Sequence, residues 1–183
     1  MSTWNSRGLR GSTLEELINR TNERYLELGL ALIQKIPTPI TPIEIDKTTR
    51  HITLAYFDQK STVDYIGVVQ GVPVCFDAKE CATETFALSN VHTHQVAFME
   101  HFEAQEGVAF FLIMFKEQDR FYYLPYRDFR PFWDRAQAGG RKSFRVDELD
   151  ERFFLPQTAE RSILVPYLEA MKLDLQLRYE GES

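Results

Sequence analysis

Long apolar runs, cysteine and net positive charge are all scarce in this sequence of 183 residues. No stretch of about 18 apolar residues is present to span a membrane, and the first residues lack the apolar core of a secretory signal. Cys75 and Cys81 are the only cysteines, and they stand six apart in a stretch typical of strand and loop. We therefore expect a cytoplasmic protein in which both thiols are free.

The charge of the chain is acidic and unevenly distributed. The 21 Lys and Arg residues stand against 27 Asp and Glu, a net charge of -6, which by itself argues against a nucleic-acid binder because phosphate contacts need cations. The excess acid is C-terminal: residues 146–183 carry a net charge of -5, whereas residues 116–145 carry +4, with aromatic residues between the bases. The first interpretation is that the aromatic residues belong to the core and the bases form a solvated rim around it. The alternative is that the segment forms a basic surface that binds DNA.

Apolar and aromatic residues make up 44% and 13% of the chain, enough to fill a core. A single domain over residues 1–183 is expected, with an acidic helix in the C-terminal stretch 156–183. Hydrophobic periodicity predicts an α/β fold in the order helix, strands, helix, strand, strand, helix. The helices are expected from Ser12 or Thr13 up to Gly29 and over 92–105, 127–138 and 160–177. The strands are expected over 30–36, 65–69, 72–76, 108–115 and 121–124.

Three prolines interrupt the chain after the first predicted strand. Pro37, Pro39 and Pro42 exclude both a helix and a central strand. Short strand patterns over 43–46 and 51–56 then flank a polar turn at 47–50. Residues 36–61 are therefore predicted to form a protruding two-stranded arm.

A β-hairpin is predicted around Gln70-Gly71, since glycine supplies the positive φ of a two-residue turn. In that register Asp64 lies opposite Asp77 and Thr62 opposite Lys79, with all four side chains on one face. Two opposed carboxylates repel each other. A bound cation or a raised pKa on one acid has to compensate.

Two carboxylates and a neutral oxygen ligand suit Mg²⁺ or Mn²⁺. An ion held there beside a phosphodiester would promote its hydrolysis, and Lys79 would stabilise the charge of the transition state. The alternative is structural: both acids end strands at the rim of the sheet and Lys79 is their ion-pair partner. The residues alone leave the two interpretations equal.

The pattern Thr62-Val-Asp64 followed by Asp77-Ala-Lys79 resembles the PD-(D/E)XK nuclease signature. Its surroundings resemble the RecU family of Holliday-junction resolvases, in the family's order over about residues 5–155. The matching segments are Gly11-Ser-Thr-Leu-Glu15, Thr21-Asn22, Lys35-Ile-Pro37-Thr-Pro39, Ala55-Tyr-Phe57, Ser61-Thr62, Phe86, His92, His94-Gln95, Phe132-Trp133, Gly140-Arg-Lys-Ser143 and Asp147-Glu-Leu149.

The resemblance implies a homodimer with a restriction-endonuclease-like αβββαβ core, a mixed central sheet and a stalk, here residues 36–61, that enters the junction. It implies Thr62, Asp64, Asp77 and Gln95 as ligands of Mg²⁺, which Mn²⁺ can replace. Asp64, Asp77 and Lys79 would be catalytic, as would Glu15, where related nucleases often keep an acid. The family commonly has Glu where Asp77 stands. Strand-exchange recombinases and branch-migration helicases are the partners that it suggests.

We thus expect a Mg²⁺-dependent endonuclease that resolves Holliday junctions by paired symmetric cuts in recombination and repair. Its DNA phosphate contacts are expected from Arg7, Arg10, Lys60, Arg141, Lys142 and Arg145. Two alternatives stay open. One is a nuclease of the same superfamily acting on flaps or foreign duplex DNA, and the other is an accessory protein that binds junctions without cutting them.

Overall fold

The computed structural model describes residues 13–37, 39–57, 62–156 and 162–180. Its helices are α1 (Leu14–Glu27), α2 (Thr93–Glu103), α3 (Tyr126–Gln137) and α4 (Tyr167–Glu180). The strands are β1 (Ala31–Lys35), β2 (Ile40–Ile45), β3 (Ile52–Phe57), β4 (Tyr65–Val69), β5 (Val72–Cys81), β6 (Thr85–Ala87), β7 (Val108–Phe115), β8 (Arg120–Pro125) and β9 (Ser143–Arg145).

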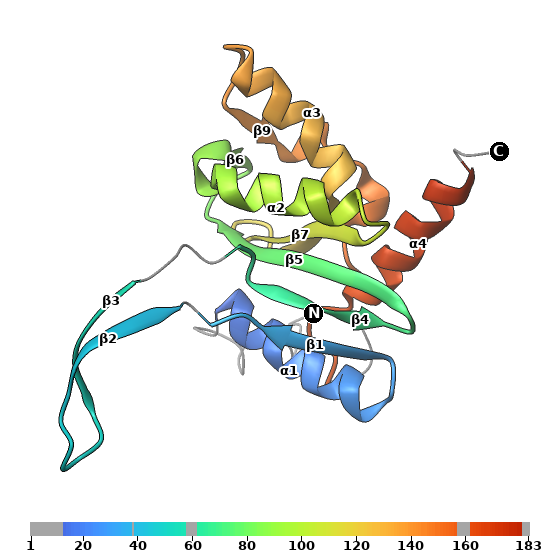
Figure 1. The fold of residues 1–183 in the computed structure, drawn as a ribbon. Coiled ribbons are helices and arrows are strands. Elements are labelled where there is room, and N and C mark those ends of the chain that lie inside the picture. Colours follow the sequence, from blue (N-terminus) through green and yellow to red (C-terminus); the bar gives the residue numbers. More distant parts are fainter. Residues whose placement is uncertain (1–12, 38, 58–61, 157–161, 181–183) are drawn as a thin grey trace.

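Five strands form one mixed sheet in the order β1-β4-β5-β7-β8. Strands β1, β4 and β5 are antiparallel, β7 runs parallel to β5, and β8 returns antiparallel to β7. A parallel pair needs a crossover connection, and α2 supplies it. Helix α1 lies on one side of the sheet, and α2 and α3 lie on the other (Figure 1). From α1 to β7 the sheet and its helices follow the order αβββαβ, which confirms the predicted fold class.

The core is a row of stacked aromatic rings across this sheet. Ring centroids are 4.7 Å apart between Tyr65 and Phe76, 4.7 Å between Phe76 and Phe110, and 4.4 Å between Phe110 and Tyr123. Tyr167, at the start of α4, packs on Phe76 and Phe110 from the side of the sheet that α1 covers, where it also contacts Tyr25. Such pairs add to the free energy gained from burial alone. Strand β7 is buried along nearly its whole length, as its apolar run predicts.

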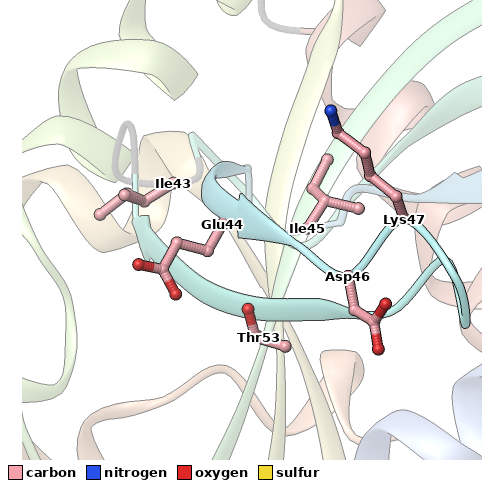
Figure 2. Close-up of a pocket in the computed structure, with 6 residues that line it drawn as sticks. All are labelled: Ile43, Glu44, Ile45, Asp46, Lys47 and Thr53. Atoms are coloured by element: carbon pink, nitrogen blue, oxygen red, sulfur yellow. The ribbon is translucent and has the colours of Figure 1, made fainter.

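Strands β2 and β3 pair with each other in a separate antiparallel sheet, where the prolines predict an arm. The arm projects away from the five-stranded sheet (Figure 1). An open hollow on it is lined by residues 43–47 and Thr53, with Ile45 and Lys47 pointing to one side of β2 and Glu44 and Asp46 to the other (Figure 2). Large apolar side chains stay exposed along the arm: Ile40, Ile43, Ile45, Ile52, Leu54 and Tyr56.

Three local features differ from the sequence-based expectations. The last helix begins at Tyr167 rather than at residue 160, because Pro166 has no N–H to donate and is tolerated only before or at the first turn. Strand β5 continues to Cys81, five residues past its predicted end. Strands β6 and β9, each of three residues, form a small sheet that was not predicted. Among the described residues, no helix is long and apolar enough to cross a membrane.

Candidate active site

The hairpin between β4 and β5 sets the position of two carboxylates. Gln70 and Gly71 both have positive φ, 47° and 93°, as a two-residue hairpin turn of the favoured twist requires. The pairing runs from Val69↔Val72 to Tyr65↔Phe76, which confirms the predicted register. Asp64 directly precedes β4, and Asp77 lies within β5. The pair that follows Tyr65 and Phe76 in this register is therefore Asp64 opposite Asp77.

Hydrogen bonds hold the two acids against each other. The Asp64 backbone N–H donates to Asp77 Oδ1 at 2.9 Å, and the Ala78 backbone N–H donates to Asp64 Oδ2 at 2.8 Å. Each carboxylate is therefore oriented by the backbone of the opposite strand. Charge-assisted bonds of this kind are stronger than neutral ones.

Lys79 and Gln95 complete a cluster around Asp77, whose side chain is fully buried. The Lys79 ammonium Nζ lies 2.6 Å from Asp77 Oδ2, and the Gln95 amide Nε2 donates to the same oxygen at 2.6 Å. Gln95 Oε1 accepts from the His92 backbone N–H at 3.0 Å and from Lys79 Nζ at 3.4 Å. Asp77, Lys79 and Gln95 thus form a closed triangle between β5 and the first turn of α2.

The environment raises the pKa of Asp64 to about 6. Burial is the largest cause and the nearby charge of Asp77 is the second, while the Ala78 N–H and Lys79 act in the opposite direction. The ionised pair is therefore costly without a further positive charge. This is the electrostatic situation that the opposed acids predict.

A stability measurement tests this pKa in metal-free protein. A carboxyl with a raised folded-state pKa stays protonated in the folded state while the unfolded state ionises, so folding free energy is lost as pH rises from about 4 through 6. In EDTA, Asp64→Asn should therefore gain stability relative to wild type between pH 4.5 and pH 7, on the order of 1 kcal/mol after solvent screening. Urea unfolding at both pH values measures the gain.

Glu117→Asn is the matched control, because Glu117 is an exposed acid in a turn. It makes the same change of charge away from the two opposed acids, and it is measured at the same two pH values. Equal pH dependence of wild type and Asp64→Asn would contradict the raised pKa.

The donor atoms present fit a divalent cation. Two carboxylates, the Gln95 amide oxygen and the Thr62 hydroxyl are hard oxygen donors of the kind that Mg²⁺ and Mn²⁺ prefer. Gln95 Oε1 faces the His92 N–H and Lys79, so a ligand role requires its amide group to turn. In the orientation described, Gln95 instead orients Asp77 and Lys79.

Two predicted site residues are outside the set that these contacts join. Thr62 is exposed two residues before Asp64, outside β4 and its pairing. Glu15, in the first turn of α1, forms an ion pair with Lys35, which is in register with Tyr65. Neighbouring residues alternate between the faces of a strand, so this pair lies on the side opposite to Asp64. The structure therefore does not bring the Glu15 carboxylate together with Asp77, Lys79 and Gln95.

Glu80 was not assigned a role from the sequence. It accepts a hydrogen bond from the Leu14 backbone N–H at 2.7 Å and forms an ion pair with Lys116. These contacts lower the pKa of Glu80, first through Lys116 and then through the Leu14 N–H. The carboxylate thereby fixes the N-terminus of α1 to β5, where helix N–H groups favour an anion. Its place in the sequence, directly after Lys79, was the signal from which a role for this acid could have been predicted.

Three of the predicted DNA contacts, Arg7, Arg10 and Lys60, lie outside the described residues. Lys142 is exposed. Arg141 forms an ion pair with Glu148, and Arg145 lies 3.3 Å from Asp147 and 3.9 Å from Glu84. The basic segment therefore meets acids of the C-terminal segment, and part of its positive charge is neutralised within the molecule.

The αβββαβ fold, with one acid before β4 and a second acid two residues before a lysine in β5, defines a nuclease of the PD-(D/E)XK class. Nucleases of this class act with a divalent metal ion. Residues 9–173 match the sequence profile of the family described as "RecU: Recombination protein U". The chain belongs to this family.

Two similar proteins agree with the match. The chain is 39% identical to the Holliday junction resolvase RecU of Pediococcus pentosaceus, over 90% of this chain and 83% of the relative. It is 40% identical to the protein of that name from Listeria innocua, over 79% and 74%. The solved structure of Archaeoglobus fulgidus Hjc, a Holliday junction resolvase, aligns at a TM-score of 0.31 and 9% identity, over 58% of this chain and 70% of that one.

Proposed function

We propose that this chain is a metal-dependent endonuclease that resolves four-way DNA junctions by paired symmetric cuts. The observation that carries the proposal is the cluster of Asp64, Asp77 and Lys79, joined by hydrogen bonds and an ion pair of 2.9 Å or less. The names of the RecU relatives support the junction as substrate. We propose Mg²⁺ as the ion, with Mn²⁺ able to replace it.

The residues of the cluster divide the work in this proposal. Asp64 and Asp77 hold the ion. Gln95, once its amide has turned, and the exposed Thr62 hydroxyl are the proposed further oxygen donors. A bound divalent ion supplies Lewis-acid stabilisation of the negative charge on the scissile phosphate. Lys79, with its side chain 15% exposed and its ammonium on Asp77, holds a positive charge where that negative charge develops. Glu15 is left out of this set because its carboxylate is engaged by Lys35.

The proposal includes a homodimer, because two equivalent cuts across a junction require two active sites related by a two-fold axis. Arg141, Lys142 and Arg145, with Arg7, Arg10 and Lys60, are the proposed phosphate contacts. Strand-exchange recombinases and branch-migration helicases are the proposed partners, and the cytoplasm the proposed location.

A cleavage assay on three DNA substrates tests the function. A synthetic four-way junction is compared with linear duplex and a flap of matched sequence, in Mg²⁺ and in Mn²⁺. Paired symmetric nicks confined to the junction are expected. Cutting of flap or duplex at the junction's rate would favour the other nuclease function, and junction binding without cuts in either ion would favour the accessory role.

We also propose that the arm enters the centre of the junction. An isolated two-stranded sheet is marginally stable in water, yet the arm exposes six large apolar side chains. Apolar side chains inserted between base pairs are a known means of holding bent or opened DNA. The arm's exposed face is therefore suited to unstacked bases at a branch point, where a continuous duplex offers none.

A double substitution tests the arm. Ile45 and Ile52 are cross-strand partners and are 55% and 47% exposed. Ile45→Ser with Ile52→Ser should weaken junction binding about 30-fold, since burial of the exposed half of each side chain contributes about 1 kcal/mol. Gel-shift titration in EDTA measures the binding constant.

Leu26→Ser on α1 is the matched control, because Leu26 is 56% exposed and lies outside the arm. It should leave junction binding unchanged. An equal loss with both variants, or an equal loss on linear duplex, would contradict the role of the arm.

A further inference from the structure

An ion pair joins the last helix to the end of α2. Arg178, near the end of α4, places Nη1 at 2.6 Å from Glu103 Oε2 and Nη2 at 2.8 Å from Glu103 Oε1. Glu103 is the last residue of α2. Both side chains are about four-fifths buried. A two-bond guanidinium–carboxylate contact fixes direction as well as distance, so it determines where this end of α2 lies.

Both members of the pair are anchored independently. Glu103 Oε1 also accepts the Ala109 backbone N–H of β7 at 2.8 Å. Arg178 Nε donates to the fully buried Asp174 at 3.1 Å, and Asp174 also binds Arg127 of α3 and the Tyr123 hydroxyl of β8. The two acids and two arginines balance in charge. Helix α2 is thus held at this end by the sheet, by α4 and, through Asp174, by α3.

The other end of α2 carries Gln95, eight residues before Glu103 and about 12 Å away along the helix. Gln95 contacts Asp77 and Lys79 in the candidate active site. Because backbone hydrogen bonds fix the rise between the residues of a helix, a shift of α2 at Glu103 is passed along the helix to the Gln95 amide. A change of a few tenths of an ångström is enough to lengthen its 2.6 Å bond to Asp77.

We propose that Arg178 is a positioning residue for the metal site, acting through Glu103 and α2 on Gln95. The proposal rests on the proposed metal-dependent function. Arg178 and Asp174 lie beyond residues 9–173, where the family profile ends, so the profile does not describe this contact. The acidic C-terminal helix then has a part in the active site without touching DNA.

The alternative is that the ion pair only stabilises the fold, and a matched control separates the two. Arg178→Met removes the pair while keeping much of the side-chain volume. Met171→Ala removes a buried apolar side chain from the same helix and leaves the pair intact. Both should lower the melting temperature, and all measurements are made at a temperature where every variant is folded.

Two readouts are sensitive to the position of Gln95. The first is solvent exchange of its side-chain amide protons in metal-free protein, followed by ¹⁵N NMR. The second is the Mn²⁺ concentration that gives half-maximal junction cleavage. Arg178→Met should speed the exchange and raise the half-maximal Mn²⁺ concentration about 10-fold, the lower end of what loss of a supporting partner costs a metal site.

Further variants complete the test. Arg178→Lys should change both readouts less than Arg178→Met does, because lysine keeps the positive charge but not the two-bond contact. Glu103→Gln should reproduce Arg178→Met, and the double variant should add little to either. Glu103→Gln carries the test if Arg178→Met does not fold. Met171→Ala should leave both readouts within about twofold of wild type, as expected for a change distant from the site.

The outcomes distinguish this inference from the proposed function. If Arg178→Met and Met171→Ala change both readouts equally, or neither changes them, Arg178 has only a structural role. If wild type does not cleave the junction in any ion, the proposed function fails. The amide exchange of Gln95 then still decides whether Arg178 positions it.

Discussion

Asp77→Ala is expected to abolish junction cleavage and to leave junction binding intact. Asp77 is fully buried and its two oxygens bind Asp64 N–H, Lys79 and Gln95, so its loss removes a proposed metal ligand and releases three partners together. The cleavage rate should fall more than about 100-fold, beyond the upper end of what loss of an outer partner of a metal costs. Single-turnover cleavage and gel-shift binding measure the two effects.

Asp77→Asn separates chemistry from packing. It keeps the volume of the side chain and one oxygen acceptor, so the fold should be preserved while the charge proposed to hold the ion is lost. Glu117→Ala, at an exposed acid, is the control for a change in net charge. Cleavage by Asp77→Asn at the wild-type rate would sink the assignment of Asp77, and loss of binding by either Asp77 variant would assign it to DNA contact instead.

The central part of the site was predictable from local chemistry. Gln70-Gly71 fixes a two-residue turn, and the register that follows places Asp64 beside Asp77. Burial and, after it, the predicted repulsion from Asp77 raise the pKa of Asp64. Local sequence succeeds here because every step depends on residues within one hairpin.

The prediction that Gln95 belongs to the site depended on the family resemblance instead. Gln95 stands 18 residues after Asp77, and no turn or spacing rule fixes where α2 begins relative to β5. The placement of this helix follows from β7 pairing parallel to β5, a long-range contact that a sequence pattern does not encode. The orientation of the Gln95 amide depends in addition on the His92 N–H.

The separation of basic and acidic stretches along the chain does not persist in the folded structure. The basic stretch 116–145 and the acidic stretch 146–183 suggested a basic face and a separate acidic helix. In the fold they are ion-pair partners, as with Arg141 and Glu148, or Arg127 and Asp174. A sequence count cannot separate cations that face DNA from cations that neutralise buried acids, because the sign of the charge is the same.

Asp174→Ala is expected to cause the largest loss of stability of any single acid in the C-terminal segment. Asp174 is fully buried and accepts from Arg127 at 2.8 Å, from Arg178 at 3.1 Å and from the Tyr123 hydroxyl at 3.0 Å. Its removal leaves three donors without their acceptor in a poorly solvated place. The unfolding free energy should fall by about 3 kcal/mol, or roughly 10 °C in melting temperature for a chain of this size.

Glu151→Ala is the matched control for this stability loss, because Glu151 also pairs with an arginine, Arg120, but its side chain is 75% exposed. Exposed pairs contribute between zero and about 1 kcal/mol, since water screens the charges and the side chains lose freedom. Guanidinium unfolding at pH 7 compares the two. If Asp174→Ala loses no more stability than Glu151→Ala, the cost of desolvating the buried Asp174 equals the free energy gained from its ion pairs and hydrogen bond. In that case α4 is held to the sheet chiefly by Tyr167 and its aromatic neighbours, and the ion pairs of Asp174 set geometry without adding stability.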